Sequence, residues 1–395
     1  MMKMTSEDLR KSFLNFFQQR GHTILPSVSL IPHDPTLLLT IAGMVPFKPI
    51  FLGKVKSPLT RVTTSQKCVR VNDLENVGYT ARHHTFFEML GNFSFGDYFK
   101  KEVCPWAWEF LTGTLGLSPD RMWVSVHHKD RETCEIWKNG VGVPAGRIVF
   151  LGDDDNFWAS GPVGPCGFCS EIYYDTGEKK GCGKPECGPG CSCDRYLEVW
   201  NLVFMEFDRK ADGSLAELPH KNIDTGMGLE RLSSVVQGTE TDYETDLFLP
   251  LIHELEKLSG ESYQSPPLRS SFRIVADHIR AITFLLADGV YPSNEGRGYV
   301  LRRLVRRAFR YGGKLSIQKP FLHELLLTVV SEMGDTYPEL LEKKNIMSQL
   351  VLQEETRFEE TLQSGLSSLE ELIHSVRTRG DRTVSGKDIF RLYDT

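Results

Sequence analysis

The sequence lacks the common fingerprints of nucleotide-binding loops. No segment matches G-x-x-x-x-G-K-[S/T], and no G-x-G-x-x-G follows a predicted strand, which excludes a P-loop enzyme and disfavours a dinucleotide-binding fold. The first residues contain no apolar leader, and no run approaches the length of a membrane span. We therefore expect a cytoplasmic protein without a membrane partner, in which any nucleotide binds to side chains on a sheet surface.

The composition is that of an ordinary globular protein. Of 395 residues, 40% are hydrophobic and 25% are charged, and the formal net charge is −6. A sizeable core is therefore available, and no global positive charge indicates nucleic acid. A chain of this length is expected to form two or three domains. Nine cysteines without a secretory leader predict reduced thiols or metal ligands in place of a disulfide framework.

Hydrophobic periodicity predicts an α+β fold in two domains. Residues 1–240 carry strand patterns without a regular βαβ repeat, which favours a mainly antiparallel sheet flanked by helices. Residues 241–395 are predicted to be mainly helical, with a Ser/Pro-rich linker at 259–267. The last residues, 390–395, predict a strand that is cut short inside its domain.

The individual elements follow the same periodicities. A helix is predicted over residues 5–20, with Thr5 as its cap and Asp8 three residues later. Strands are predicted at 23–31, 36–41, 122–127, 147–151, 171–175 and 196–208, and further helices at 106–111, 273–287, 298–311, 320–333 and 345–379.

Residues 60–98 concentrate polar chemistry between two predicted strands. The block contains several phenylalanines, Glu88 and the basic residues Arg61, Lys67, Arg70, Arg82, His83 and His84. Cations in such a loop can hold a polyphosphate, and a ring such as Phe86 or Phe87 can stack on a purine. The alternative is an ordinary hairpin with solvated basic residues.

A second block, Asp224-Thr-Gly-Met-Gly228 followed by Leu-Glu-Arg231, precedes a predicted helix. Glycine lets the backbone approach a ligand closely, and a helix N-terminus favours anions. Asp224 could pair with an ammonium group, although an aspartate at this place is also a common N-cap.

These two blocks closely resemble motifs 2 and 3 of the class II aminoacyl-tRNA synthetases, and specifically those of the alanyl-tRNA synthetases. The resemblance implies that Arg70 binds the α-phosphate of ATP and the substrate carboxylate, that Arg231 binds the γ-phosphate, and that Asp224 binds the alanine ammonium group. The implied site for ATP with Mg²⁺ comprises Arg70, Arg82, His83, His84, Phe86, Phe87, Glu88, Gly228 and Arg231. The implied alanine site comprises Met44, Arg70, Trp158, Asn201, Val203, Asp224 and Gly226.

The activity implied by this resemblance is alanine activation followed by transfer to tRNA(Ala). The chain is similar to the N-terminal part of such an enzyme, without its editing region, and the fragment is expected to be able to act as a monomer. It departs from the family at Ile41, where an asparagine is usual before Ala42-Gly-Met44, so an amide near the pocket is missing. Rejection of serine is expected to be weak, because an apolar pocket discriminates poorly against an added hydroxyl.

The sequence is also compatible with two other functions. One is another ATP-dependent adenylating ligase of the same fold. The other is a non-catalytic RNA-binding protein built on a synthetase scaffold, which should have lost Arg70, Asp224 or Arg231; all three are present.

Six of the nine cysteines fall between Cys166 and Cys193. Cys166 and Cys169 lie in a segment that resembles a synthetase motif without metal. The remaining four, Cys182, Cys187, Cys191 and Cys193, are spaced among glycines and suit a tetrahedral zinc site. A glycine-rich surface loop without metal is the alternative.

A predicted helix at 298–311 carries a strip of arginines, Arg302, Arg303, Arg306, Arg307 and Arg310, without an acidic residue among them. Such a strip favours contact with a phosphate backbone, although a solvated helix face is the ordinary alternative. The resemblance implies recognition of a G·U pair in the acceptor stem of tRNA(Ala), for which Asn294 and Asp394 match the residues that read the bases.

Overall fold

The computed structural model describes residues 4–380 and 382–393, which form two compact units, one up to Pro250 and one from Leu251 onward. The boundary predicted from the sequence was near residue 240. The first unit extends further because Asp242, Tyr243 and Phe248 pack around His84. None of the helices in these described residues is long and apolar enough to cross a membrane.

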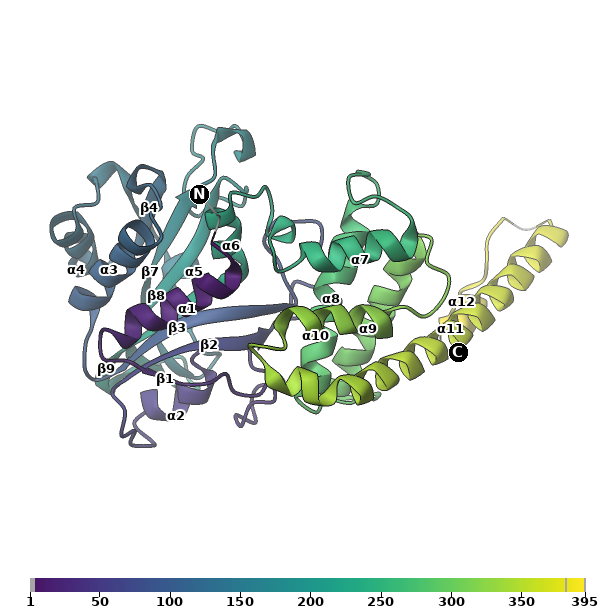
Figure 1. The fold of residues 1–395 in the computed structure, drawn as a ribbon, viewed down its shortest axis with the longest axis horizontal. Coiled ribbons are helices and arrows are strands. Elements are labelled where there is room, and N and C mark those ends of the chain that lie inside the picture. The colour runs from purple at the N-terminus through teal and green to yellow at the C-terminus, as the bar shows by residue number, and fades with distance from the viewer. Residues whose placement is uncertain (1–3, 381, 394–395) are drawn as a thin grey trace. The chain divides into compact units, whose positions relative to one another are not determined.

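Nine strands of the first unit form one mixed sheet (Figure 1). The strand order is β1-β2-β3-β9-β8-β7-β4-β5, with β6 added on β7, and the pairing is antiparallel except at the two ends, β1–β2 and β4–β5. The α+β prediction with a mainly antiparallel sheet is therefore confirmed. The strands are β1 (Thr23–Ile24), β2 (Arg61–Val69), β3 (Phe86–Phe95), β4 (Met122–His127), β5 (Ile148–Leu151), β6 (Phe157–Ala159), β7 (Gly164–Asp175), β8 (Tyr196–Arg209) and β9 (Leu215–Gly228).

Helices α1 (Ser6–Gln18), α3 (Lys100–Glu109) and α6 (Leu229–Gln237) cover one face of this sheet. Side chains at alternate positions of β3, β8 and β9, such as Leu90, Trp200 and Met227, share a core with the apolar stripe of the first helix. The other face carries a second, smaller core and the polar side chains described below. The helices are α1 (Ser6–Gln18), α2 (Lys48–Phe51), α3 (Lys100–Glu109), α4 (Arg131–Glu135), α5 (Asp153–Asn156) and α6 (Leu229–Gln237).

Helix α1 begins where the sequence predicted. Thr5 caps it by accepting a hydrogen bond from the Asp8 amide, and Asp8 accepts one from the Thr5 amide in return. On its buried side, the Arg10 guanidinium donates to both carboxylate oxygens of Glu88 at 2.7 and 2.6 Å. This buried ion pair fixes α1 to β3.

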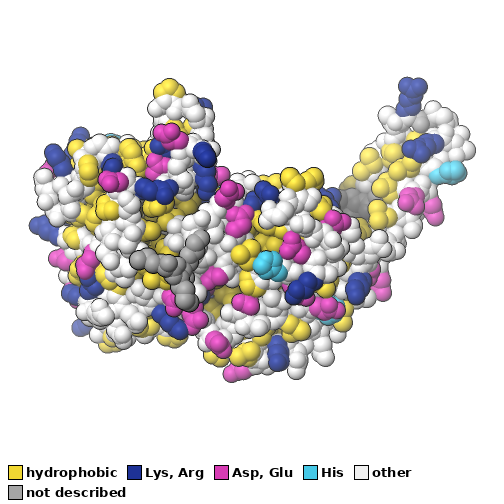
Figure 2. Space-filling view, turned by 45° about the horizontal axis from the view of Figure 1, so that its top comes forward, with side chains coloured by type: hydrophobic (Ala, Val, Ile, Leu, Met, Phe, Trp, Pro, Cys, Tyr) yellow, Lys and Arg dark blue, Asp and Glu magenta, His cyan; other side chains and the backbone are white. Residues whose placement is uncertain are grey.

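The second unit is helical. Its central helix α8 is buried on almost every turn and packs against α9, α10 and α11, as expected of a helix that is apolar around most of its circumference. The far half of α11 is different, because Leu362, Leu366 and Leu369 remain 36%, 50% and 38% exposed. Hydrophobic side chains are visible on the surface of the molecule in Figure 2. The helices are α7 (Leu249–Ser259), α8 (Arg269–Ala287), α9 (Gly296–Lys314), α10 (Leu322–Met333), α11 (Pro338–Thr378) and α12 (Gly386–Tyr393).

Three strand predictions are wrong. Residues 23–31 form a strand only at Thr23–Ile24, and residues 36–41 form none, because the prolines at 26, 32 and 35 cannot donate to a ladder. The C-terminal run predicted as a strand lies in helix α12, which Ser385 and Asp388 cap. Residues 394–395 lie outside the described residues.

We expect Arg10→Met to lower the free energy of unfolding by about 3–5 kcal/mol, because it removes the cation that faces a fully buried carboxylate. Lys11→Met is the matched control on the same helix. Its pair with Glu7 is exposed and should contribute about 0–1 kcal/mol. Urea unfolding of both variants measures the difference, and equal losses would show that the Arg10–Glu88 pair does not fix α1.

Candidate functional site

A cavity of about 330 Å³ opens on the sheet face opposite α1. The side chains that enter it alternate along β3, β8 and β9 with those of the helix-side core. Its walls are formed by Ala42, Arg70, Asp73, Arg82, His83, His84, Phe87, Met89, Trp158, Glu171, Glu198, Val199, Asn201, Val203, Asp224, Gly226, Gly228, Glu230 and Arg231. The two blocks singled out in the sequence therefore meet in one cavity.

Asp224 supplies a buried carboxylate on the floor of the cavity. It lies within β9 opposite Val203 and is 5% exposed. The N-cap of α6 is Gly228, so the alternative role of Asp224 as a cap is wrong. Burial raises the pKa of Asp224 to about 7, and no charge or hydrogen bond from the described residues offsets this rise. Such a carboxylate is suited to receive a cation from a ligand.

Apolar side chains surround this carboxylate and limit the space beside it. Ala42, Trp158 and Val203 line the cavity with Met89. A Cβ atom on Gly226 would lie 3.0 Å from the Met89 sulfur, so glycine at this position keeps the floor open. Met44 was expected here, but it is 1% exposed and packs in the core beneath the cavity without lining it.

Arginines provide positive charge in the cavity, and Arg70 and Arg231 are each held by a protein acceptor. The Arg70 Nε donates to the Ile41 carbonyl at 2.9 Å, and its guanidinium lies 5.1 Å from the centre of the Phe87 ring. Desolvation lowers the pKa of Arg70 from its usual value. The main-chain carbonyl makes the bond at position 41, so the loss of an asparagine side chain there leaves this anchor intact.

Arg231 lies in the first turn of α6. Its Nη1 donates to the Glu198 carboxylate at 2.8 Å and to the Glu198 carbonyl at 3.2 Å. Burial alone would lower the pKa of Arg231, but the negative charges of Glu198 and Asp242 outweigh it and raise the pKa. The guanidinium is therefore held charged and in one orientation.

The loop between β2 and β3 is fastened at each of its basic residues. His83 shares a hydrogen bond of 2.7 Å with Thr80, and His84 shares one of 3.0 Å with Asp242. Arg82 donates to the carbonyls of Ser192 and Cys193, at 3.0 and 3.3 Å. All three side chains line the cavity.

Phe86 and Glu88 do not reach this cavity, contrary to the expectation that they contact ATP. Both are fully buried on the helix side of β3, where Glu88 binds Arg10. Because side chains alternate along a strand, Phe87 and Met89 take the cavity side. Phe87 is therefore the ring available for stacking.

Three glutamates that line the cavity, Glu171, Glu198 and Glu230, were not predicted as site residues from the sequence. Glu171 of β7 accepts a hydrogen bond from Asn201 at 3.0 Å. Burial, followed by the nearby charge of Glu198, raises the pKa of Glu171 well above its usual range. A prediction that β7 pairs with β8 would have placed Glu171 opposite Asn201, and so beside the predicted alanine site.

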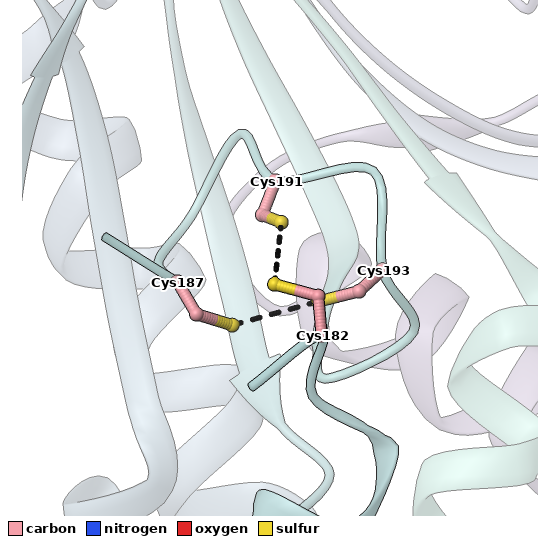
Figure 3. Close-up of side chains that lie close together, drawn as sticks. All are labelled: Cys182, Cys187, Cys191 and Cys193. Carbon is pink, nitrogen blue, oxygen red and sulfur yellow. Dashed lines mark hydrogen bonds between the residues drawn. The ribbon is translucent and has the colours of Figure 1, made fainter. Parts of the chain in front are cut away.

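The four cysteines of the loop between β7 and β8 point toward one another (Figure 3). Their sulfurs lie within 4.8 Å of one another, with 3.7 Å between Cys182 and Cys191 and 3.6 Å between Cys187 and Cys193. Four sulfurs around zinc at about 2.3 Å would lie about 3.8 Å apart, so the set fits a tetrahedral ion. Cys166 and Cys169 lie apart from it, buried in β7.

The predicted arginine strip is not free of acidic partners. Glu354 of α11 accepts hydrogen bonds from Arg302 at 2.9 Å and from Arg306 at 3.3 Å. Arg303 and Arg310 are exposed and Arg307 is partly so. Asn294 is also exposed and accepts a hydrogen bond from Arg302, and the N-cap of α9 is Glu295. Asp394 lies outside the described residues.

Comparison with known proteins gives a consistent result. Residues 8–395 match the family described as tRNA synthetases class II (A). The chain is 55% identical to an alanine--tRNA ligase of Desulfitobacterium hafniense over 393 residues, and 55% identical to one of Pelotomaculum thermopropionicum over 394. Each match covers 99% of this chain but 45% of the relative, so the chain spans less than half of their length.

Similarity to solved structures is weaker. S. aureus histidyl-tRNA synthetase has a TM-score of 0.34 and 12% identity, with 66% of this chain and 79% of that chain covered. The family assignment rests on the sequence matches.

The buried charge of Asp224 should reduce stability in a pH-dependent way. Its pKa rises from 3.8 to about 7 on folding, so the folded chain binds a proton that the unfolded chain releases, and stability falls as pH rises from about 4 to about 7. Asp224→Asn should therefore raise the free energy of unfolding at pH 8 by up to about 4 kcal/mol, and by less at pH 5.

Urea unfolding at the two pH values tests this expectation. Asp212→Asn is the control, because hydrogen bonds from Ser214 lower the pKa of that exposed carboxylate and its replacement should not stabilise the fold. A gain for Asp224→Asn that is the same at pH 5 and pH 8 would contradict the raised pKa.

Proposed function

Because the chain belongs to the class II tRNA synthetases (A), we propose that it activates alanine with ATP and transfers it to the 3′ end of tRNA(Ala). The relatives that support alanine are alanine--tRNA ligases at 51–55% identity. The reaction would take place in the cytoplasm, where reduced cysteines are usual. The full activity is proposed for a chain that covers 45% of those relatives.

Asp224 carries this proposal. Asp224 is a buried carboxylate without a partner among the described residues, in a cavity that Arg70, Arg82 and Arg231 also line. Such a carboxylate is costly unless a ligand supplies the missing cation. An α-amino acid does so with its ammonium group, while its carboxylate can be directed to Arg70. The apolar wall of Ala42, Trp158 and Val203 then leaves room for a small side chain. Alanine fits these requirements.

The chemistry proposed for the cavity is attack of the alanine carboxylate on the α-phosphorus of ATP. A P–O bond forms to the carboxylate oxygen and the bond to pyrophosphate breaks, so negative charge passes to the leaving group. Arg70 would neutralise the α-phosphate and Arg231 the γ-phosphate, each held in advance by a protein acceptor. Phe87 would stack on the adenine, with Arg82, His83 and His84 near the phosphates and Gly228 allowing close approach.

Mg²⁺ bound with ATP would neutralise further phosphate charge. Mg²⁺ in such sites is held mainly by phosphates and water with one or two carboxylates, and the Glu198 carboxylate beside Arg231 would be available as one of them. In the second step, the terminal ribose hydroxyl of tRNA would attack the alanyl carbonyl, and AMP would leave with the bonding electrons.

Recognition of tRNA(Ala) is proposed for the second unit. The exposed Arg303 and Arg310 would contact the phosphate backbone together with Arg307. Arg302 and Arg306 would contribute less, because both donate hydrogen bonds to the single carboxylate of Glu354. Asn294 would read the G·U pair in the minor groove, which is accessible in an A-form stem, together with Asp394.

Zinc is proposed for Cys182, Cys187, Cys191 and Cys193. Burial raises the pKa of the Cys193 thiol, but hydrogen bonds from Arg195 and the neighbouring thiols outweigh it and lower the pKa to about 7. A thiol that ionises readily is suited to bind metal. The ion would close the loop between β7 and β8.

We expect pyrophosphate exchange into ATP that depends on alanine and is lost in Asp224→Asn. Only the ionised Asp224 can pair with the ammonium group, so the KM for alanine should rise about tenfold for each pH unit below about 7. Asp212→Asn should keep both the exchange and its pH dependence. A panel of amino acids separates this function from that of another adenylating ligase, and exchange by Asp224→Asn at the parental rate would contradict the assignment.

For tRNA, Asn294→Ala should lower charging of G·U stems relative to G·C stems while exchange continues. Arg310→Ala should instead weaken binding of all stems alike and reduce its salt dependence, because a phosphate contact is blind to sequence. Charging rates and binding curves at several salt concentrations measure both effects. A parental G·U to G·C ratio in Asn294→Ala would leave Asn294 with only its structural bond to Arg302.

A further inference from the structure

The side chain of Arg82 joins the loop that carries the four cysteines to the cavity. This arginine lines the cavity. Its two terminal nitrogens donate hydrogen bonds to the carbonyls of Ser192 and Cys193. The Asp194 carboxylate is more distant, at 3.9 Å. The guanidinium therefore takes its orientation mainly from two main-chain oxygens of the cysteine loop.

Those two oxygens lie within the cysteine cluster. Ser192 stands between Cys191 and Cys193, and the sulfurs of these residues belong to the group of four that converges in Figure 3. An ion held by all four sulfurs would fix the main chain on both sides of Ser192. The carbonyls that orient Arg82 would thereby be fixed as well.

Other restraints on the loop lie at its base and in short turns, such as the hydrogen bond from the Cys191 amide to the Gly188 carbonyl at 3.0 Å. Its base is closed, since Arg195 pairs with Asp175 at 3.0 and 2.9 Å and Thr176 donates to the Asp194 carbonyl at 2.8 Å. Between the first and last cysteine, however, the chain contains glycines at 183, 188 and 190, which leave the backbone many conformations unless it is cross-linked. The four thiols are therefore the cross-link that would fix residues 192–193 once an ion joins them.

We infer that the cysteine cluster and the nucleotide end of the cavity are coupled through Arg82, so that zinc on the thiols and ATP in the cavity each strengthen the binding of the other. The inference rests on the proposed function, because it takes the ligand beside Arg82 to be ATP. With zinc bound, Arg82 is set in advance toward the phosphates. Without zinc, ATP must order residues 192–193 before the same contact can form.

Such coupling is reciprocal. If zinc tightens ATP binding by a given factor, ATP must tighten zinc binding by that factor, because both belong to one thermodynamic cycle. We expect a factor of about ten, within the range of about 5- to 150-fold that is typical of coupled sites. The equality of the two factors distinguishes this coupling from general damage to the fold on metal removal.

The experiment uses the whole chain loaded with Zn²⁺ and a non-hydrolysable ATP analogue. Zinc affinity is measured by competition with a chromogenic chelator, with and without saturating analogue. Analogue affinity is measured by calorimetry on the zinc-loaded and the zinc-free chain. We expect about one zinc per chain and a coupling factor of about ten from both measurements.

Two variants locate the coupling. Arg82→Lys keeps the charge but cannot bridge two carbonyls with the fork of a guanidinium, so its zinc affinity without nucleotide should remain parental while the coupling factor falls toward one. Lys184→Ala removes an exposed cation from the same loop without touching Arg82 and should keep the parental factor. Circular dichroism of each variant with zinc bound checks that the fold is retained.

Several results would overturn the inference. These are a parental chain that binds no zinc, a parental coupling factor near one, or an Arg82→Lys variant that keeps the parental factor. Failure of the proposed function gives a different result, namely the absence of alanine-dependent exchange in the zinc-loaded parent. Exchange with a coupling factor of one would overturn only the coupling.

Discussion

The alternation of side chains along β3, β8 and β9 is the constraint on which the first unit depends. Leu90, Trp200 and Met227 face the helices, and the residues next to them along each strand, such as Met89, Asn201 and Gly226, face the cavity. A register slip of one residue in one of these strands would exchange its helix-facing side chains with its cavity-facing side chains. In β9, such a slip would put the carboxylate of Asp224 into the core. The large apolar area under α1 prevents such a slip, and the Arg10–Glu88 pair adds a polar contact between α1 and β3. Helix packing on one face thus determines which side chains are available on the other.

The charged side chains of the cavity differ in whether the described residues provide them with a partner. Arg70 and Arg231 are each held by a protein acceptor, so the binding of phosphate proposed for them would need little reorganisation. Asp224 is treated differently, since burial leaves it without a compensating cation among the described residues. A carboxylate of this kind lowers stability in the free protein and favours a ligand that brings the missing charge. The balance between fold stability and ligand binding is a common property of functional sites.

Much of this arrangement followed from the sequence. The two polar blocks, the cap of α1, the antiparallel sheet and the long helices are local patterns, and local patterns are what a single sequence states most clearly. The errors have a different origin. Whether Phe86 or Phe87 faces the cavity depends on which face of the sheet the odd-numbered residues of β3 occupy. That choice is made by packing against α1, which is far away in the sequence. Glu354 lies on α11, about fifty residues beyond the arginines that it neutralises, so the strip appeared free of acid. Glu171 became visible only through the pairing of β7 with β8.

The bond between Arg70 and the carbonyl of Ile41 also affects how this chain can change over generations. Every amino acid presents the same carbonyl, so the anchor of Arg70 requires the path of the loop and does not specify which side chain occupies position 41. The Ile41 side chain is itself 36% exposed to solvent. A substitution that keeps the path of the loop leaves this anchor in place, while one that bends the loop removes it. An isoleucine at position 41 is therefore compatible with the role proposed for Arg70.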